Sequence, residues 1–291
     1  MEPFHFNATL AAVGYAVAAV FSKQALSRGA GILRFSFGVN MVFVPVFATL
    51  LLQHEGSIPW NRIHYPAITG ALFFLGQVFT FAAIRFGDVS LQTPTMGTKA
   101  VFAVLLAAVC GTEAVGFPMF LAAFVAMLGV ALLGFSGNGK ERVGLSITLA
   151  LLSSFFFAGS DTMVGVHAGG FGVPAFLFIA ISTNALLSFA MIPYFREPLR
   201  TIPKDAWPWM LAACLLMGLQ ALLLNYTLGR YQHVAEINVL YTTRGLWSVL
   251  FGALAARLFQ QSAAVGRRRM YTLRFMGAFL MCLAIAILFK L

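Results

Sequence analysis

Ten apolar runs of about 20 residues follow one another along this chain of 291 residues. A helix of about 20 residues spans the hydrocarbon core of a bilayer, which is roughly 30 Å thick. Only 10% of the residues are charged, against about 25% in soluble proteins. The expected spans are 6–26, 32–52, 66–86, 90–110, 115–136, 143–163, 173–195, 206–229, 235–257 and 271–290. The sequence therefore predicts an all-α integral membrane protein of ten transmembrane helices, surrounded by membrane lipid.

The connections between these runs are short. Ten spans use about 200 residues, and the remainder is too small for a soluble domain or a nucleotide-binding motor. The formal net charge is +10, but most Lys and Arg residues lie in short loops, where they meet anionic lipid head groups. We therefore expect no nucleic-acid partner.

The chain contains an internal repeat at an offset of 145 residues. The segment RFGDVSLQTPTMGTKAVFAVLLAA (85–108) aligns with RYQHVAEINVLYTTRGLWSVLFGA (230–253), with six identities in 24 positions and Lys99 opposite Arg244. The sequence therefore predicts two five-helix repeats, 1–139 and 140–291, that together form one transporter domain. Because five is odd, the second repeat crosses the membrane in the opposite sense, as in many secondary transporters.

Two basic residues lie near the middle of expected spans, Lys99 within 90–110 and Arg244 within 235–257. A charge at the centre of a bilayer costs about 2.5–3.5 kcal/mol on insertion scales, so such residues usually face a cavity or the bundle interior. Neighbouring polar and aromatic residues at helical spacing complete a pocket for a small molecule with an anionic group. The predicted substrate-binding residues are Gln92, Thr95, Lys99, Phe102, Tyr241, Arg244 and Trp247, together with the polar pair Asn40 and Asn184 at offset 144.

The intramembrane carboxylates leave a second interpretation open. Lys99 and Arg244 could instead pair with Asp161 and Glu236 in a network that holds helices together. Either carboxyl group could also carry a coupling proton, because desolvation favours its neutral form. The five histidines are scattered without ligand spacing, so we expect no metal site. We expect no cofactor, and no catalytic motif indicates an enzyme.

Three stretches resemble a known family: GYAVAAVFSKQAL, FAVLLAAVCGTEAVGFPMFLAAFVAMLGVALLG and RFMGAFLMCLAIAILF. They resemble the EamA-like members of the drug/metabolite transporter superfamily, in which a Gly-Glu pair ends the fourth helix and a Gly-centred fifth helix follows. Gly111, Glu113 and Gly129 stand in those places. Lys99 and Ala100 depart from the proline that the EamA group often carries here, and a basic residue at this point is similar to the sugar-phosphate and nucleotide-sugar branches.

The resemblance implies a secondary transporter working by alternating access, by default an exporter of amino acids or of other organic anions and zwitterions. One alternative is an exchanger of phosphate-bearing metabolites. Another is a membrane scaffold or accessory subunit that transports nothing. Either a monomer or a homodimer is compatible with the sequence, and the resemblance implies a bacterial inner membrane.

The distribution of basic residues bears on orientation. Fourteen Lys and Arg residues group with the odd-numbered loops and three with the opposite side. By the positive-inside rule, this count favours both termini outside the cytoplasm, whereas family habit favours them inside.

Overall fold

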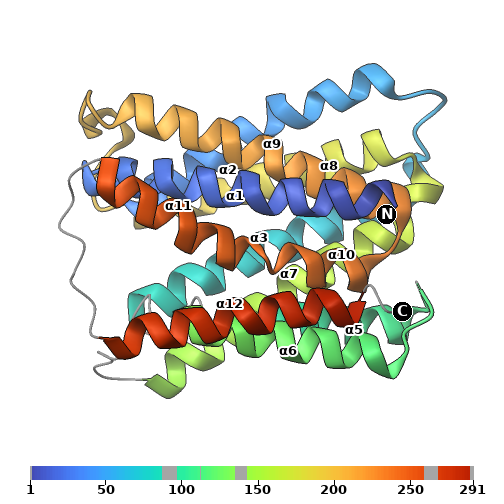
Figure 1. Cartoon of the computed structure of the whole chain (residues 1–291). Coiled ribbons are helices and arrows are strands. Elements are labelled where there is room, and N and C mark those ends of the chain that lie inside the picture. Colours follow the sequence, from blue (N-terminus) through green and yellow to red (C-terminus); the bar gives the residue numbers. More distant parts are fainter. Residues whose placement is uncertain (1, 87–96, 112, 135–142, 259–267, 289–291) are drawn as a thin grey trace.

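The computed structural model describes residues 2–86, 97–111, 113–134, 143–258 and 268–288, and these residues form helices joined by short loops (Figure 1). The helices are α1 (Pro3–Ser27), α2 (Ile32–Ala48), α3 (His64–Phe86), α5 (Thr98–Cys110), α6 (Phe117–Gly134), α7 (Val143–Phe171), α8 (Val173–Ser188), α9 (Trp207–Tyr231), α10 (Val234–Tyr241), α11 (Arg244–Leu258) and α12 (Arg268–Leu288). Two 3-10 segments, Thr49–Gln53 and Phe189–Tyr194, continue α2 and α8.

Each expected span has a helical counterpart among the described residues. Six helices are long and apolar enough to cross a membrane, and three shorter apolar helices lie at Thr98–Cys110, Phe117–Leu132 and Phe275–Leu288. The tenth counterpart is the pair α10 and α11. The prediction of an all-α protein with ten spans is confirmed.

The expected span 235–257 is not one continuous helix. It is interrupted at Thr242 and Thr243, between α10 and α11. The Thr242 hydroxyl donates to the carbonyl of Val239 at 2.6 Å, and the Thr243 hydroxyl donates to the carbonyl of Leu240 at 2.8 Å. Threonine side chains bonded to the preceding turn compete with the regular helical hydrogen bonds. As a result, α11 starts afresh at Arg244, inside the expected span.

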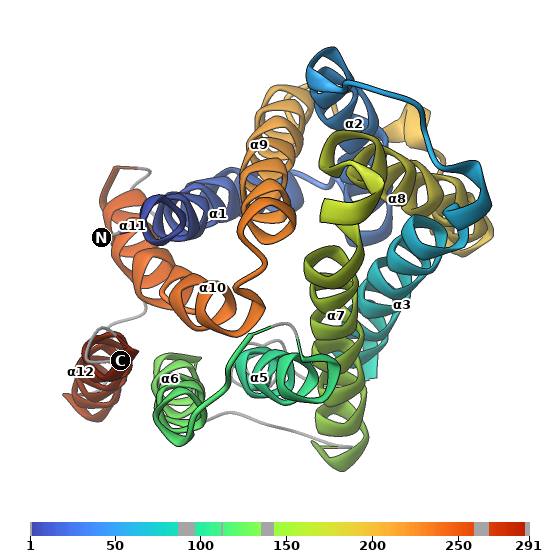
Figure 2. The ribbon, with the colours of Figure 1, turned by 90° about the vertical axis from the view of Figure 1, so that its right-hand side faces the viewer.

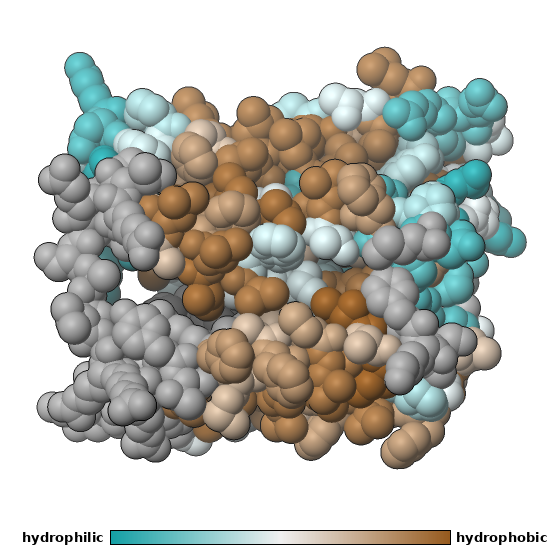
Figure 3. Space-filling view, viewed as in Figure 1, coloured by the Kyte–Doolittle hydropathy of each residue, from teal (hydrophilic) through white to brown (hydrophobic). Residues whose placement is uncertain are grey.

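The helices run roughly side by side, and α1 begins at the same end of the bundle at which α12 ends (Figure 1). We call this the terminal end. Viewed from there, α1, α5, α7, α9 and α10 are grouped around the middle, while α6 and α12 lie together at one edge (Figure 2). Apolar residues cover the middle of the visible face and hydrophilic residues gather at the terminal end (Figure 3). This distribution is the one expected of a bundle that crosses a bilayer.

Small residues let the central helices approach closely. Ala8, Ala11, Ala12 and Ala16 on α1 are fully buried. A Cβ added at Gly70 of α3 would lie 2.1 Å from the carbonyl oxygen of Ala180 in α8. Helices in membranes associate through such small residues, because lipid provides little hydrophobic driving force between them. These contacts bring polar side chains of several helices together in the interior.

Candidate functional site

Lys99 and Arg244 each lie at the start of a helix that begins within an expected membrane span. Lys99 is the second residue of α5, and Arg244 is the first residue of α11. Helix starts carry partial positive charge from their unpaired N–H groups. Each basic side chain therefore adds a positive charge to a helix end that already favours an anion.

Lys99 forms an ion pair with Asp161 of α7. The Lys99 Nζ lies 2.7 Å from Asp161 Oδ2, and the two side chains are only 10% and 5% exposed. A buried charge without a partner is costly, so this pair offsets much of the cost of placing either group inside the bundle. Lys99 thus has the carboxylate partner that one sequence interpretation considered for it.

Arg244 has a different environment. Its guanidinium carbon lies 4.8 Å from the ring centre of Tyr15 and 4.7 Å from that of Tyr241. Of the carboxylates that the structure describes, none lies within 4.0 Å of this guanidinium. Aromatic faces attract a cation without neutralising it. Among the described residues, the positive charge of Arg244 is therefore faced by two aromatic rings and by no carboxylate within ion-pair distance.

Tyr241 joins the two basic residues. Lys99 Nζ lies 5.6 Å from the Tyr241 ring centre, and the Tyr241 hydroxyl donates to Gln220 Oε1 at 2.8 Å. We call the following residues the central cluster: Tyr15, Lys99, Asp161, Gln220, Tyr241 and Arg244. With two cations and one carboxylate, the cluster carries a net charge of +1.

The other predicted polar and aromatic residues of the two spans lie outside the central cluster or outside the described residues. Gln92 and Thr95 lie outside the described residues. Phe102 packs edge-on against Phe155, with ring centres 5.7 Å apart. Trp247 stacks along its own helix on Phe251, with centres 6.2 Å apart. The structure thus gives both aromatic residues a ring partner on α7 or α11.

The two asparagines differ from each other. The Asn40 amide exchanges hydrogen bonds of 2.8 and 2.9 Å with Gln77 of α3. The side chain of Asn184 in α8 is fully buried, and within the described part of the chain it has no hydrogen-bond partner. Asn184 is therefore the asparagine whose amide has no hydrogen-bond partner among the described residues.

Two members of the central cluster were missed from the sequence. Tyr15 lies among small residues of α1, and Gln220 lies in the apolar α9. Neither belongs to the repeat motif or to a charged pattern. Only the packing of α1 and α9 against each other and the proximity of α10 bring them to Arg244 and Tyr241.

Glu236 lies apart from the central cluster, at the terminal end, where it meets other titratable residues. Its Oε1 lies 2.6 Å from His5 Nε2, and its Oε2 lies 3.6 Å from His233 Nδ1. The Oε2 of Glu113, from the loop after α5, lies 3.8 Å from the same His233 Nδ1. We call Glu113, His233 and Glu236 the terminal cluster. Among the described residues, the partners of Glu236 are therefore histidines and not Lys99 or Arg244.

The Glu113 carboxyl group has a raised pKa. Burial raises its pKa to about 7, and the nearby negative charge of Glu236 acts in the same direction, while the hydrogen bond from the N–H of Ala235 opposes the shift. Removing a carboxylate from water disfavours its charged form. The loop thus holds a carboxyl group that a further cation would readily ionise.

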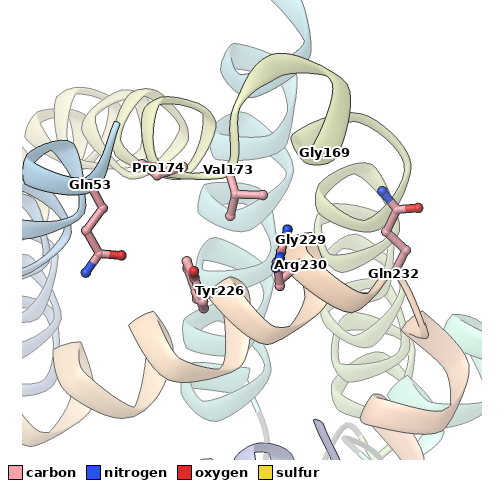
Figure 4. A pocket seen from close by; sticks show the side chains of 8 residues that line it. All are labelled: Gln53, Gly169, Val173, Pro174, Tyr226, Gly229, Arg230 and Gln232. Atoms are coloured by element: carbon pink, nitrogen blue, oxygen red, sulfur yellow. The ribbon is translucent and has the colours of Figure 1, made fainter. Parts of the chain in front are cut away.

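A cavity of about 420 Å³ opens near the same end. Figure 4 shows Gln53 and Gln232 on opposite sides of it, with Tyr226 and Arg230 of α9 between them. None of its lining residues belongs to the central cluster. This pocket is therefore separate from the central cluster.

The helical spans and the buried charges at their centre define a multi-pass integral membrane protein. The family model of the EamA-like transporter family matches residues 4–135, so this part of the chain is similar to that family. The match indicates a transporter of the drug/metabolite transporter type for a small-molecule substrate, and not an enzyme. The resemblance deduced from the sequence motifs is confirmed.

The fold has a counterpart among solved structures. A chain titled only "Crystal structure of protein" superposes with a TM-score of 0.76 at 14% sequence identity, and the match covers 98% of each chain. At this identity the likeness concerns the fold alone. No curated protein sequence matches the chain.

Proposed function

We propose that the protein is a secondary transporter that binds a small organic anion or zwitterion at the central cluster. The observation that carries this proposal is Arg244, a cation in the bundle interior whose described neighbours are the rings of Tyr15 and Tyr241. A guanidinium binds a carboxylate through two parallel hydrogen bonds. The adjacent start of α11 adds favourable partial charges for the same anion.

The net charge of the central cluster bears on the substrate class. Asp161 neutralises Lys99, so only one positive charge remains for the ligand. One positive charge matches one carboxylate, as in an amino acid or a simple organic acid, better than a phosphate carrying two charges. We therefore place amino acids and other carboxylates first and phosphate-bearing metabolites second.

We also propose that the halves 1–139 and 140–291 are inverted repeats that rock around the central cluster. In this repeat α1, α2 and α3 are equivalent to α7, α8 and α9, and the helix contacts follow the same equivalence. The contact of α3 with α7 corresponds to that of α9 with α1, and the contact of α3 with α8 corresponds to that of α9 with α2. Lys99 and Arg244 are equivalent in the same repeat. This correspondence supports alternating access, in which two similar halves open the site to one side and then to the other.

We propose that the protein exports its substrate from a bacterial cell. We also propose that both termini lie outside the cytoplasm, because the count of basic residues favours this orientation. Cysteine labelling or a reporter fusion at residues 267–269 tests the orientation. Labelling of these residues from outside the cell would contradict it.

The central experiment measures counterflow of labelled amino acids and organic acids in proteoliposomes. We expect saturable flux for at least one carboxylate, and we expect Arg244→Gln to abolish it. Arg62→Gln removes a guanidinium from an exposed position near the terminal end and is expected to retain normal flux. Near-normal flux in Arg244→Gln would rule out the proposed site. A well-folded wild-type protein with no flux for any substrate would favour the scaffold alternative.

A further inference from the structure

The three ligand-type atoms of the terminal cluster lie close together. One oxygen from Glu113, Nδ1 of His233 and one oxygen from Glu236 all fall within 4.8 Å of one another. The imidazole nitrogen is 3.8 Å from the first carboxylate and 3.6 Å from the second. Ligand atoms around a tetrahedral Zn²⁺ are about 3.4 Å apart, because each bond is about 2.0–2.1 Å long. The two nitrogen–oxygen spacings need shifts of only a few tenths of an ångström, and the two carboxylate oxygens lie within 4.8 Å of each other.

Neighbouring groups orient the two carboxylates toward this common point. His5 Nδ1 accepts the backbone N–H of Glu2 at 3.0 Å, so His5 Nε2 carries the ring proton and donates to Glu236 Oε1. The backbone N–H of Ala235 donates to Glu113 Oε1. Each carboxylate therefore uses one oxygen for an outer hydrogen bond and keeps the other facing His233. Outer partners of this kind orient ligands in protein metal sites.

Two further observations point to a ligand. The Glu113 side chain is 7% exposed, and its Oε2 accepts no hydrogen bond from any residue that the structure describes. A buried polar atom without a partner is costly. The His233 ring is held by stacking on Phe4, with centres 4.6 Å apart and planes within 8°. Its side chain is 46% exposed, which leaves a path for an ion and room for a water ligand.

We propose that Glu113, His233 and Glu236 bind a transition-metal dication of the Zn²⁺ type, with His5 as the outer residue that orients Glu236. Two carboxylates balance the charge of the dication, and an imidazole nitrogen favours Zn²⁺ over Mg²⁺ or Ca²⁺, which prefer oxygen ligands. The bound ion joins the loop after α5 to the start of α10. This site was not expected from the sequence, because 122 positions separate Glu113 from Ala235.

The test is zinc binding by the full-length protein in detergent, measured by calorimetry after treatment with a chelator. We expect one Zn²⁺ per chain and a higher unfolding temperature with Zn²⁺. Glu113→Gln, His233→Ala and Glu236→Gln should each weaken binding by more than about tenfold. Glu55→Gln and His64→Ala, which change exposed residues of the same types, are the matched controls and should bind as the wild type does. Mg²⁺ and Ca²⁺ should give no saturable signal.

X-ray absorption at the zinc edge provides a second measurement that does not depend on the variants. We expect a first shell of nitrogen and oxygen only. A sulfur ligand would overturn the proposal, since Cys110 is exposed and close in sequence to Glu113. No saturable binding to the wild type, or equal binding by the three variants and the controls, would also overturn it. Neither measurement requires a transported substrate, so the outcome is independent of the proposed function.

Discussion

Lys99 and Asp161 form an ion pair inside the bundle, with Lys99 Nζ 2.7 Å from Asp161 Oδ2. The pair connects α5 to α7 and therefore joins the two proposed halves of the chain. It also leaves Arg244 as the member of the central cluster with an uncompensated charge. The ion pair thus contributes to the contact between the proposed halves and leaves Arg244 as the cation that we propose meets the substrate.

Asp161→Asn should lower the stability of the folded protein strongly. Removing one partner of a buried ion pair leaves the other charge without compensation and costs about 3–5 kcal/mol. Thermal unfolding in detergent measures this loss. The double variant Lys99→Met with Asp161→Leu removes both charges and should recover most of the lost stability. If the double variant is as unstable as Asp161→Asn, the ion pair is not the cause.

Tyr15→Leu should weaken substrate binding, whereas Tyr15→Phe should preserve it. The Tyr15 ring faces the Arg244 guanidinium at 4.8 Å, and a cation–π contact of this kind contributes about 0.5–2 kcal/mol. Leucine removes the aromatic face and phenylalanine keeps it. The apparent affinity measured by substrate-induced thermal shift distinguishes the two variants. Equal affinities would show that the ring does not position Arg244.

Asn184→Leu should raise the unfolding temperature and lower transport. The Asn184 amide is fully buried and, within the part of the chain that is described, unpaired. Such a group costs about 1–3 kcal/mol, and leucine has a similar size without polar atoms. Melting curves and proteoliposome flux together test the idea. Greater stability with unchanged flux would remove Asn184 from the substrate site, and unchanged stability would mean that the amide has a partner.

Gly70→Ala should destabilise the contact between α3 and α8. The new Cβ would lie 2.1 Å from the backbone carbonyl oxygen of Ala180, which cannot move without displacing α8. Overpacking of this kind costs about 1–3 kcal/mol. Gly144→Ala is the control, because a Cβ there meets nothing within 4 Å. Equal unfolding temperatures for the two variants would contradict the close approach of these helices.

The ten helical spans could be predicted from the sequence because the cost of exposing backbone and polar groups to lipid acts on each segment of about 20 residues by itself. The importance of Lys99 and Arg244 follows from the same local cost. Their equivalence came from the internal repeat, which aligns TKAVF with TRGLW. These conclusions needed no knowledge of how the helices pack.

The break before Arg244 was not predicted. A window of apolar residues shows a span, but it does not show whether Thr242 and Thr243 turn their hydroxyl groups toward the preceding carbonyls. The choice between regular helical hydrogen bonds and these side-chain bonds depends on the surrounding helices. For this reason the sequence placed Arg244 within one long helix, and the structure places it at the beginning of α11.

The sequence by itself determined the class of protein, the number of spans and two of the central charges, because hydropathy and insertion cost are properties of short segments. The tertiary structure alone decided the partners: Asp161 for Lys99, two tyrosine rings for Arg244, and His5 with His233 for Glu236. Residues far apart in the chain meet only when helices pack, and the energy of a buried charge depends on the groups that packing places within a few ångströms of it.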